Sequence, residues 1–123
     1  MYQLEFTDRS EYLYVHASGA LSPETDLAID KDVRTQCEKR NLHCALIDIR
    51  TMESRLSGLE NHNAATTFKE RMGQVTTVAV IDLQKYYERS EMYQLTTANR
   101  DTNIRFFTQE ADAVKWLETE INR

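Results

Sequence analysis

Two short apolar segments constrain the fold most: CALIDI at 44–49 and VTTVAVID at 75–82. Neither alternates strictly between apolar and polar residues, which is typical of a strand buried on both faces of a parallel sheet. Each segment is followed by a helical pattern, from about 59 to 72 and from about 90 to 98. Strands that alternate with helices predict an α/β fold with a mostly parallel or mixed sheet.

The remaining elements complete the order β-β-α-β-α-β-α-β-α. Two β-rich runs, 2–7 and 11–18, predict a hairpin whose first strand is an antiparallel edge. Ser22-Pro23 predicts a helix start, with serine as the N-cap and proline at the first helical position. A last strand at 103–107 precedes a helix that Thr108 is expected to cap.

The spacing of apolar residues predicts which side of each helix faces the core. Asp30 falls on the opposite side of the first helix and is expected to be solvated. The residues expected to face inward are Leu27, Ile29, Val33 and Cys37, then Ala64, Ala65, Phe68 and Met72, then Met92 and Leu95, and finally Ala113, Leu117 and Ile121.

Length and composition exclude several classes of protein. The 123 residues predict a single domain over 1–123 with one buried core. A formal net charge of −5 without a basic stripe argues against a nucleic-acid partner. No apolar run is long enough for an integral membrane helix, and the N-terminus has no secretory pattern. Cys37 and Cys44 lack zinc-ligand or disulfide-framework spacing, so we expect a cytoplasmic protein without a metal or cofactor.

Three local motifs stand out: ALIDIR at 45–50, AVID at 79–82, and the tail from Asn99-Arg100 to Trp116-Leu117 with its IRFF strand. Together they resemble the SpoIIAA-like family, which is related to the STAS domain. Asp101 stands where relatives often have glycine, so we expect a differently built turn there. The resemblance covers nearly the whole chain. It implies a regulatory or ligand-binding domain, lipid-binding in kind, and not an enzyme.

Ser57 lies where STAS domains of the anti-sigma-factor-antagonist type carry a phosphorylatable serine. The resemblance to that pattern consists of Asp48 on a strand and Ser57-Gly58 at the start of the next helix, whereas Arg55-Leu56 replaces an Asp-Ser pair. The sequence SGLE is also a capping box, in which Ser57 and Glu60 each bond the other's backbone amide. We therefore interpret Ser57 first as a helix cap and second as a candidate phosphoacceptor.

Open α/β sheets bind ligands at the carboxyl ends of their strands, where loops converge. We therefore predict a surface on loops 50–58 and 83–90 that binds a protein partner or a small apolar, lipid-like ligand. Its mixture of rings and cations is typical of binding surfaces. Arg50 is expected to share one crevice with Tyr86 and Tyr87. The predicted surface comprises Asp48, Arg50, Arg55, Ser57, Asp82, Tyr86, Tyr87 and Arg89.

Two alternatives to this binding module stay open. One is an anti-sigma-factor antagonist switched by phosphorylation of Ser57. The other is a small hydrolase or transferase in which Asp48, Asp82 and a histidine perform acid–base chemistry. The sequence contains neither a Ser-His-Asp nor a Cys-His pattern, and it has no glycine-rich phosphate loop. We therefore expect no catalytic residues. The oligomeric state is not defined by the sequence.

Overall fold

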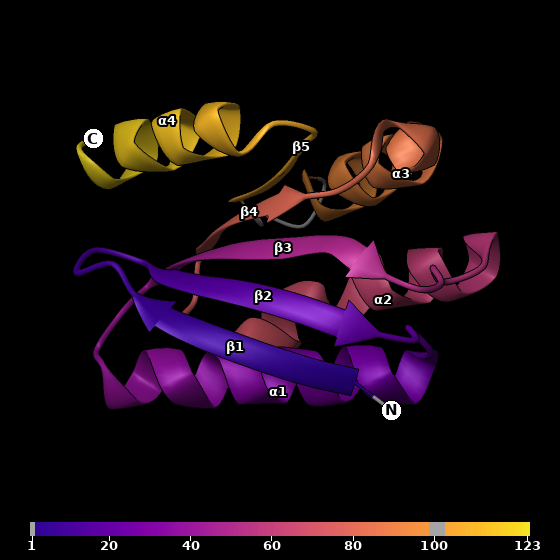
Figure 1. Cartoon of the computed structure of the whole chain (residues 1–123), viewed down its shortest axis with the longest axis horizontal. Coiled ribbons are helices and arrows are strands. Elements are labelled where there is room, and N and C mark those ends of the chain that lie inside the picture. The colour runs from indigo at the N-terminus through magenta and orange to yellow at the C-terminus, as the bar shows by residue number, and fades with distance from the viewer. Residues whose placement is uncertain (1, 99–102) are drawn as a thin grey trace.

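The fold is built on a five-stranded sheet with the strand order β1-β2-β3-β4-β5 (Figure 1). The computed structural model describes residues 2–98 and 103–123. β1 runs antiparallel to β2 and all other neighbouring strands are parallel, which confirms the predicted hairpin and mixed sheet. The turn expected at Asn99–Asp101 lies outside the described residues. The strands are β1 (Tyr2–Asp8), β2 (Leu13–Gly19), β3 (Cys44–Met52), β4 (Thr77–Ile81) and β5 (Asn103–Phe107).

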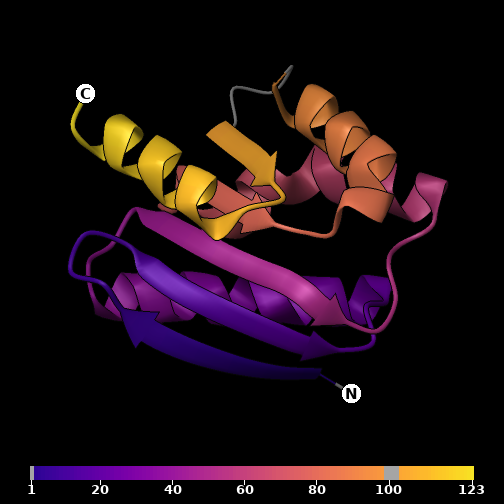
Figure 2. The same cartoon turned by 45° about the horizontal axis from the view of Figure 1, so that its top comes forward.

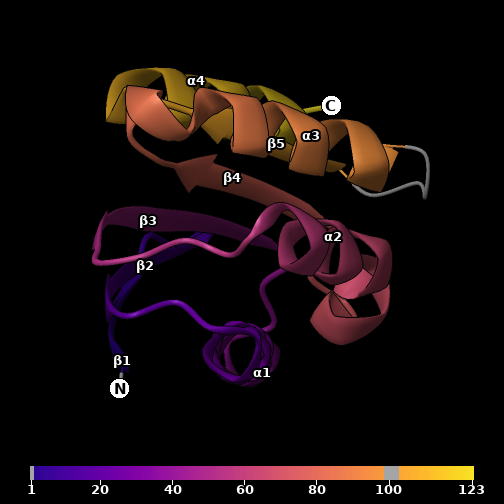
Figure 3. The same cartoon turned by 90° about the vertical axis from the view of Figure 1, so that its right-hand side faces the viewer.

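Helices cover both faces of the sheet. One face is covered by α1 (Pro23–Lys39), α2 (Gly58–Met72) and α3 (Tyr87–Ala98), with α2 between the other two (Figure 3). A short 3-10 helix, η1 (Gln84–Tyr86), leads directly into α3. The opposite face is covered by α4 (Glu110–Ile121), so that β5 lies between α3 and α4 (Figure 2).

The buried core is divided by the sheet into two clusters. Along β3, Ala45 and Ile47 belong to the cluster under α1, α2 and α3, whereas Leu46 belongs to the cluster under α4. Successive side chains of a strand point to opposite faces. This explains why the CALIDI segment is apolar without alternation. It also decides on which face each polar side chain further along β3 will lie.

Two of the three helix caps that the sequence predicts are present. Ser22 caps α1 by accepting a hydrogen bond from the Thr25 amide at 3.2 Å, and Ser57 caps α2. The third expectation is wrong: the N-cap of α4 is Gln109, whose side chain makes no capping bond, and Thr108 lies one residue earlier. The helix expected from about 90 begins earlier, at Tyr87.

The expected orientations of four residues, in the two helices α1 and α3, are wrong. In α1, Leu27 is 54% exposed, and Asp30 is buried because Arg71 of α2 forms an ion pair with it. In α3, Met92 and Leu95 are exposed, because the helix packs through Tyr93 instead. The other predicted inward residues are buried or packed against the core: Ile29, Val33, Cys37, Ala64, Ala65, Phe68, Met72, Ala113, Leu117 and Ile121.

Both cysteines are free thiols, Cys37 buried and Cys44 half-buried. Burial raises the pKa of the Cys37 thiol to about 11, so it stays protonated and packs as a small apolar side chain. Among the described residues, no helix is long and apolar enough to cross a membrane.

Candidate functional site

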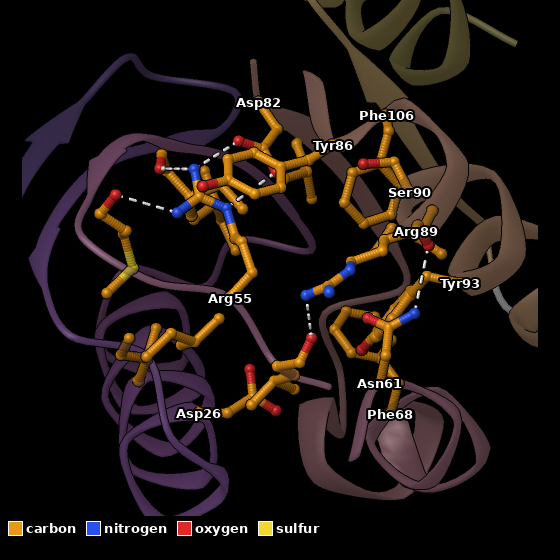
Figure 4. Close-up of a pocket in the computed structure, with 18 of the residues that line it drawn as sticks. Asp26, Arg55, Asn61, Phe68, Asp82, Tyr86, Arg89, Ser90, Tyr93 and Phe106 are labelled. Atoms are coloured by element: carbon orange, nitrogen blue, oxygen red, sulfur yellow. Dashed lines mark hydrogen bonds and ion pairs between the residues drawn. The ribbon is translucent and has the colours of Figure 1, made fainter. Parts of the chain in front are cut away.

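A cavity opens on the α1–α3 face of the sheet, where β3 and β4 end (Figure 4). Its volume is about 90 Å³, which is enough for several water molecules. Apolar side chains from the sheet and the helices line most of it: Ile29, Ile47, Ile49, Met52, Phe68, Val80, Tyr93, Ile104 and Phe106. The polar lining is made by Asp26, Asp30, Arg55, Asn61, Asp82, Tyr86, Arg89 and Ser90.

Arg55 crosses one side of this cavity, and its side chain is only 5% exposed. The guanidinium donates to both carboxylate oxygens of Asp82, at 3.1 Å from Nε and 2.6 Å from Nη2. Its other donors bond the backbone carbonyls of Ile49, Met52 and Ser54, each at 2.9 Å. A guanidinium has five N–H donors, so every one is used. Arg55 therefore organises the loop after β3 and has no donor left for a ligand.

The Arg55–Asp82 pair joins the two loops that the sequence analysis assigned to one surface. Asp82 also accepts a hydrogen bond from the Leu83 amide at 2.7 Å, which fixes the start of the second loop. The ring of Tyr86 lies over the guanidinium of Arg55, 4.2 Å from ring centroid to Cζ. A cation over an aromatic face is an attractive arrangement. Loops 50–58 and 83–90 are thus brought together, but by a buried contact between their own residues.

Arg89 enters the same cavity from α3, and its partners are different. One guanidinium nitrogen donates to the backbone carbonyl of Leu56 at 2.5 Å. The Arg89 carbonyl in turn accepts a hydrogen bond from the side chain of Asn61 at 3.1 Å (Figure 4). Within residues 2–98 and 103–123, no carboxylate forms an ion pair with Arg89. Arg89 is exposed overall, so water solvates its charge and can reach the guanidinium donors that the Leu56 carbonyl does not use.

Asp48 and Arg50 lie on the opposite, α4-covered face of the sheet. Arg50 donates to both Asp48 oxygens, at 3.0 and 2.8 Å, and lies 3.7 Å from Glu110 at the start of α4. Tyr14 donates to Asp48 and lies equally close to Glu110, at 3.3 Å from each. This cluster holds the first turn of α4 against β2 and β3.

The expected crevice shared by Arg50, Tyr86 and Tyr87 is not formed by the described residues. Tyr86 lines the cavity, whereas Tyr87 is 53% exposed and lies outside it. Arg50 belongs to β3, which continues to Met52, and the alternation of that strand directs its side chain to the α4 face. The sequence analysis placed it in a loop, where this constraint would not apply.

The electrostatics of the α4-face cluster favour a charged Asp48 and a protonated Tyr14. Burial works to raise the pKa of Asp48, but hydrogen bonds and charge from Arg50 outweigh it and hold that pKa below its ordinary value. Burial first, and then the carboxylates of Asp48 and Glu110, raise the pKa of Tyr14 to about 12. Both states suit the hydrogen bonds observed, so the cluster is internally satisfied.

Asp48 and Asp82 cannot act together as an acid–base pair in this structure. Asp48 lies under α4 and is bound by Arg50, whereas Asp82 lines the cavity on the other face and is bound by Arg55. General acid–base catalysis requires both groups within reach of one substrate. In the part of the chain that the structure describes, no cluster of three or more His, Cys, Asp or Glu residues could hold a metal ion.

The sequence analysis missed a buried charged group on α1 and α2. Arg71 lies 3.3 Å from a carboxylate oxygen of Asp26 and also forms an ion pair with Asp30. Burial raises the pKa of Asp26, although the charge of Arg71 opposes this. The available signal was the spacing of the two aspartates, which places them on one helix face. Their partner on α2 could be identified only from the tertiary structure.

Ser57 forms the predicted capping box. The Glu60 amide donates to the Ser57 hydroxyl at 3.3 Å, and the Ser57 amide donates to the Glu60 carboxylate at 2.9 Å. We expect Ser57→Ala to lower the free energy of unfolding by about 0.5–2 kcal/mol, and Ser57→Asp to be nearly neutral because aspartate caps equally well. Urea denaturation of both variants measures the difference. An alanine variant as stable as the wild type would contradict the capping role.

Three solved structures resemble the chain over nearly its whole length. An anti-sigma factor antagonist from Mycobacterium paratuberculosis matches with a TM-score of 0.62 and 18% identity, over 96% of this chain and 95% of that one. An uncharacterised protein from Shewanella loihica, described as having a SpoIIAA-like fold, matches with a TM-score of 0.59 and 20% identity, over 94% and 93%. The anti-sigma factor antagonist SpoIIAA in its unphosphorylated form matches with a TM-score of 0.57 and 12% identity, over 97% of each chain.

No protein-family model matches the sequence, and no curated protein matches it either. The identities to the three structures are low, so their similarity bears on the fold and not on particular site residues. The order of strands and helices agrees with the architecture that the sequence motifs implied. The chain therefore has the SpoIIAA-like fold, which confirms at the level of the fold the resemblance that the sequence motifs indicated.

Proposed function

We propose that residues 1–123 act as one non-enzymatic regulatory domain that binds a protein partner through α2 and α3. Two of the similar structures are named as anti-sigma factor antagonists, which supports a regulatory role of this general kind. The observation that carries the proposal is the exposure of two large apolar side chains on α3, which an ordinary surface helix would turn to the core.

The inward face of α3 is formed by Ser90, Tyr93 and Thr97, of which two carry hydroxyls on short side chains. Its outward face carries Met92 and Leu95, which are 61% and 57% exposed. A surface helix normally turns its apolar stripe to the core and its polar residues to solvent. Here large apolar side chains remain on the surface although the helix is well packed. Such a surface is typical of a site that a partner covers.

A third exposed apolar residue lies on the neighbouring helix α2. Leu59 is 72% exposed in the first turn of α2, and α2 packs directly beside α3. We call Leu59, Met92 and Leu95, together with the exposed Glu88 and Glu91, the α2–α3 surface. Its acidic residues and the net charge of −5 favour a partner that presents an apolar patch bordered by basic residues.

Met92→Glu combined with Leu95→Glu should weaken partner binding by at least about tenfold, because apolar residues at the centre of an interface carry most of its affinity. Leu27→Glu is the matched control, since Leu27 is an equally exposed leucine on α1. Both variants should keep the melting temperature of the wild type within a few degrees. The partner is identified by comparing proteins captured by the three forms from the native host, and its Kd is then measured with purified components.

Several outcomes would contradict this assignment. One is capture of the same partner by the double variant with an unchanged Kd, and another is an equal loss of binding in Leu27→Glu. Size-exclusion chromatography with light scattering provides a further check. If wild type is a dimer and the double variant a monomer, the α2–α3 surface joins two copies of this chain and not a separate partner.

Phosphorylation of Ser57 stays a prediction within the same regulatory class. The residue is exposed and lies beside Leu59, so a phosphate there would change the α2–α3 surface. The Glu60 carboxylate, 2.9 Å from the Ser57 amide, would repel it. Intact-mass spectrometry of the protein from its native host tests for the modification. The cytoplasmic location likewise stays a prediction, based on the two free cysteines.

A further inference from the structure

We propose that the cavity at the ends of β3 and β4 is a second binding site, separate from the α2–α3 surface, for a small carboxylate with a short apolar chain. The carboxylate would bind Arg89, and the chain would enter the apolar part of the cavity. The sequence analysis expected a ligand of apolar character near these loops. The charged and apolar parts of the cavity together indicate which chemical groups that ligand would carry.

The apolar part of the cavity is built largely on the sheet. Ile47 and Ile49 come from β3, Val80 from β4, and Ile104 and Phe106 from β5, so the sheet itself forms one wall. Small-molecule sites are commonly apolar clefts with a few polar groups that fix orientation. The volume of about 90 Å³ suits a short chain and not a long acyl chain.

The charges around the cavity leave one group available for a ligand. Arg55 and Asp82 satisfy one another, and every donor of Arg55 is used. Asp26 and Asp30 share Arg71. Arg89 has only the neutral carbonyl of Leu56 as a described partner. An arginine with free donors beside an apolar cavity favours a carboxylate, which it binds in a planar, bidentate manner.

Ser90 supplies a second polar group next to Arg89. Its side chain lines the cavity and the residue is only 8% exposed. Among the residues that the structure describes, none forms a hydrogen bond with its hydroxyl. The hydroxyl oxygen is itself open to the cavity, so it can form a hydrogen bond with a molecule that enters there. The Ser90 hydroxyl lines the same cavity as Arg89 and can donate to a ligand there (Figure 4).

Titration of the ¹⁵N- and methyl-labelled protein with hexanoate, followed by NMR, tests this proposal. Saturable shifts should centre on Ile47, Ile49 and Ile104. Butyrate should bind more weakly because it buries less apolar area, and dodecanoate should gain nothing over hexanoate. Hexanol should bind more weakly than hexanoate, and hexylamine should bind no better than hexanol. A preference for hexylamine would overturn the proposal, since it would assign the polar end to Asp26 instead.

Arg89→Gln should weaken hexanoate binding by about tenfold or more, as expected for loss of charge-assisted hydrogen bonds. Binding of hexanol should be unchanged in this variant, which shows that the apolar cavity is still formed. Lys85→Gln is the control, because Lys85 is an exposed cation in the preceding turn and does not line the cavity.

Equal loss of hexanoate binding in both variants, no loss in Arg89→Gln, or no saturable shift with hexanoate would each overturn the proposal. Met92→Glu/Leu95→Glu should still bind hexanoate, so this site and the α2–α3 surface are tested independently.

Discussion

Replacing Arg55 with alanine should lower the free energy of unfolding by about 3–5 kcal/mol, because the substitution leaves the Asp82 carboxylate buried and unpaired. The Asp82 side chain is 6% exposed, so water cannot compensate for the lost guanidinium. The carbonyls of Ile49, Met52 and Ser54 lose their donor as well. Equilibrium urea denaturation measures the change, and Arg55→Lys should recover only part of it, since an ammonium cannot supply five donors.

Arg34→Ala provides the matched control for this prediction. Arg34 forms an exposed ion pair with Glu38 one turn along α1, with side chains 43% and 45% exposed. Pairs of this kind contribute about 0.3–0.5 kcal/mol. The double variant Arg55→Ala/Asp82→Ala should be less destabilised than the sum of the two single variants, because the unpaired charge is removed. A loss below about 1 kcal/mol for Arg55→Ala would contradict a structural role for the pair.

Asp48→Asn should cost about 1–3 kcal/mol at neutral pH, because it removes a buried carboxylate that pairs with Arg50. Tyr14 keeps Glu110 as a second acceptor, so the loss should be smaller than for Arg55→Ala. Glu53→Gln is the control, since Glu53 is an exposed carboxylate just after β3. Urea denaturation across a range of pH measures both variants against the wild type.

The pH dependence of the Asp48 effect follows from the lowered pKa of its carboxyl in the folded protein. The unfolded chain takes up a proton on this group near its ordinary pKa of about 3.9, whereas the folded protein does so only at lower pH. The stabilisation is therefore complete above the unfolded pKa and is lost as the pH falls through the folded one. The difference between wild type and Asp48→Asn should be constant above about pH 5 and should shrink below pH 4. A difference that grows on acidification would contradict this assignment.

The order of elements could be predicted from the sequence because its signals are local. Unalternating apolar strands, the Ser22-Pro23 start and the SGLE capping box each depend on residues within a few positions of one another. Ser57 and Glu60 are only three residues apart, so their mutual hydrogen bonds follow once a helix starts there. The same reasoning failed for Thr108, where the chain enters α4 one residue later than the cap pattern suggested.

The candidate site could be located only roughly, at the carboxyl ends of β3 and β4. That Arg55 binds Asp82, 27 residues away, and that Arg71 binds Asp30 depends on how loops and helices meet in space. Which face of the sheet receives Arg50 depends on where β3 ends, and the structure extends that strand to Met52. Local sequence patterns specify neither these long-range ion pairs nor the residue at which β3 ends.

Sequence alone determined which segments become strands and helices, whereas the tertiary structure decided which side of each one is buried. A helical repeat defines an apolar stripe, but burial depends on the surface that neighbouring elements offer. In α3, Tyr93 fits between Phe68 and Phe106, with ring centroids 5.9 and 5.5 Å apart. One large ring packed against two others buries more area than Met92 would. The helix therefore turns Tyr93 inward and leaves Met92 exposed, where the proposed partner would bind.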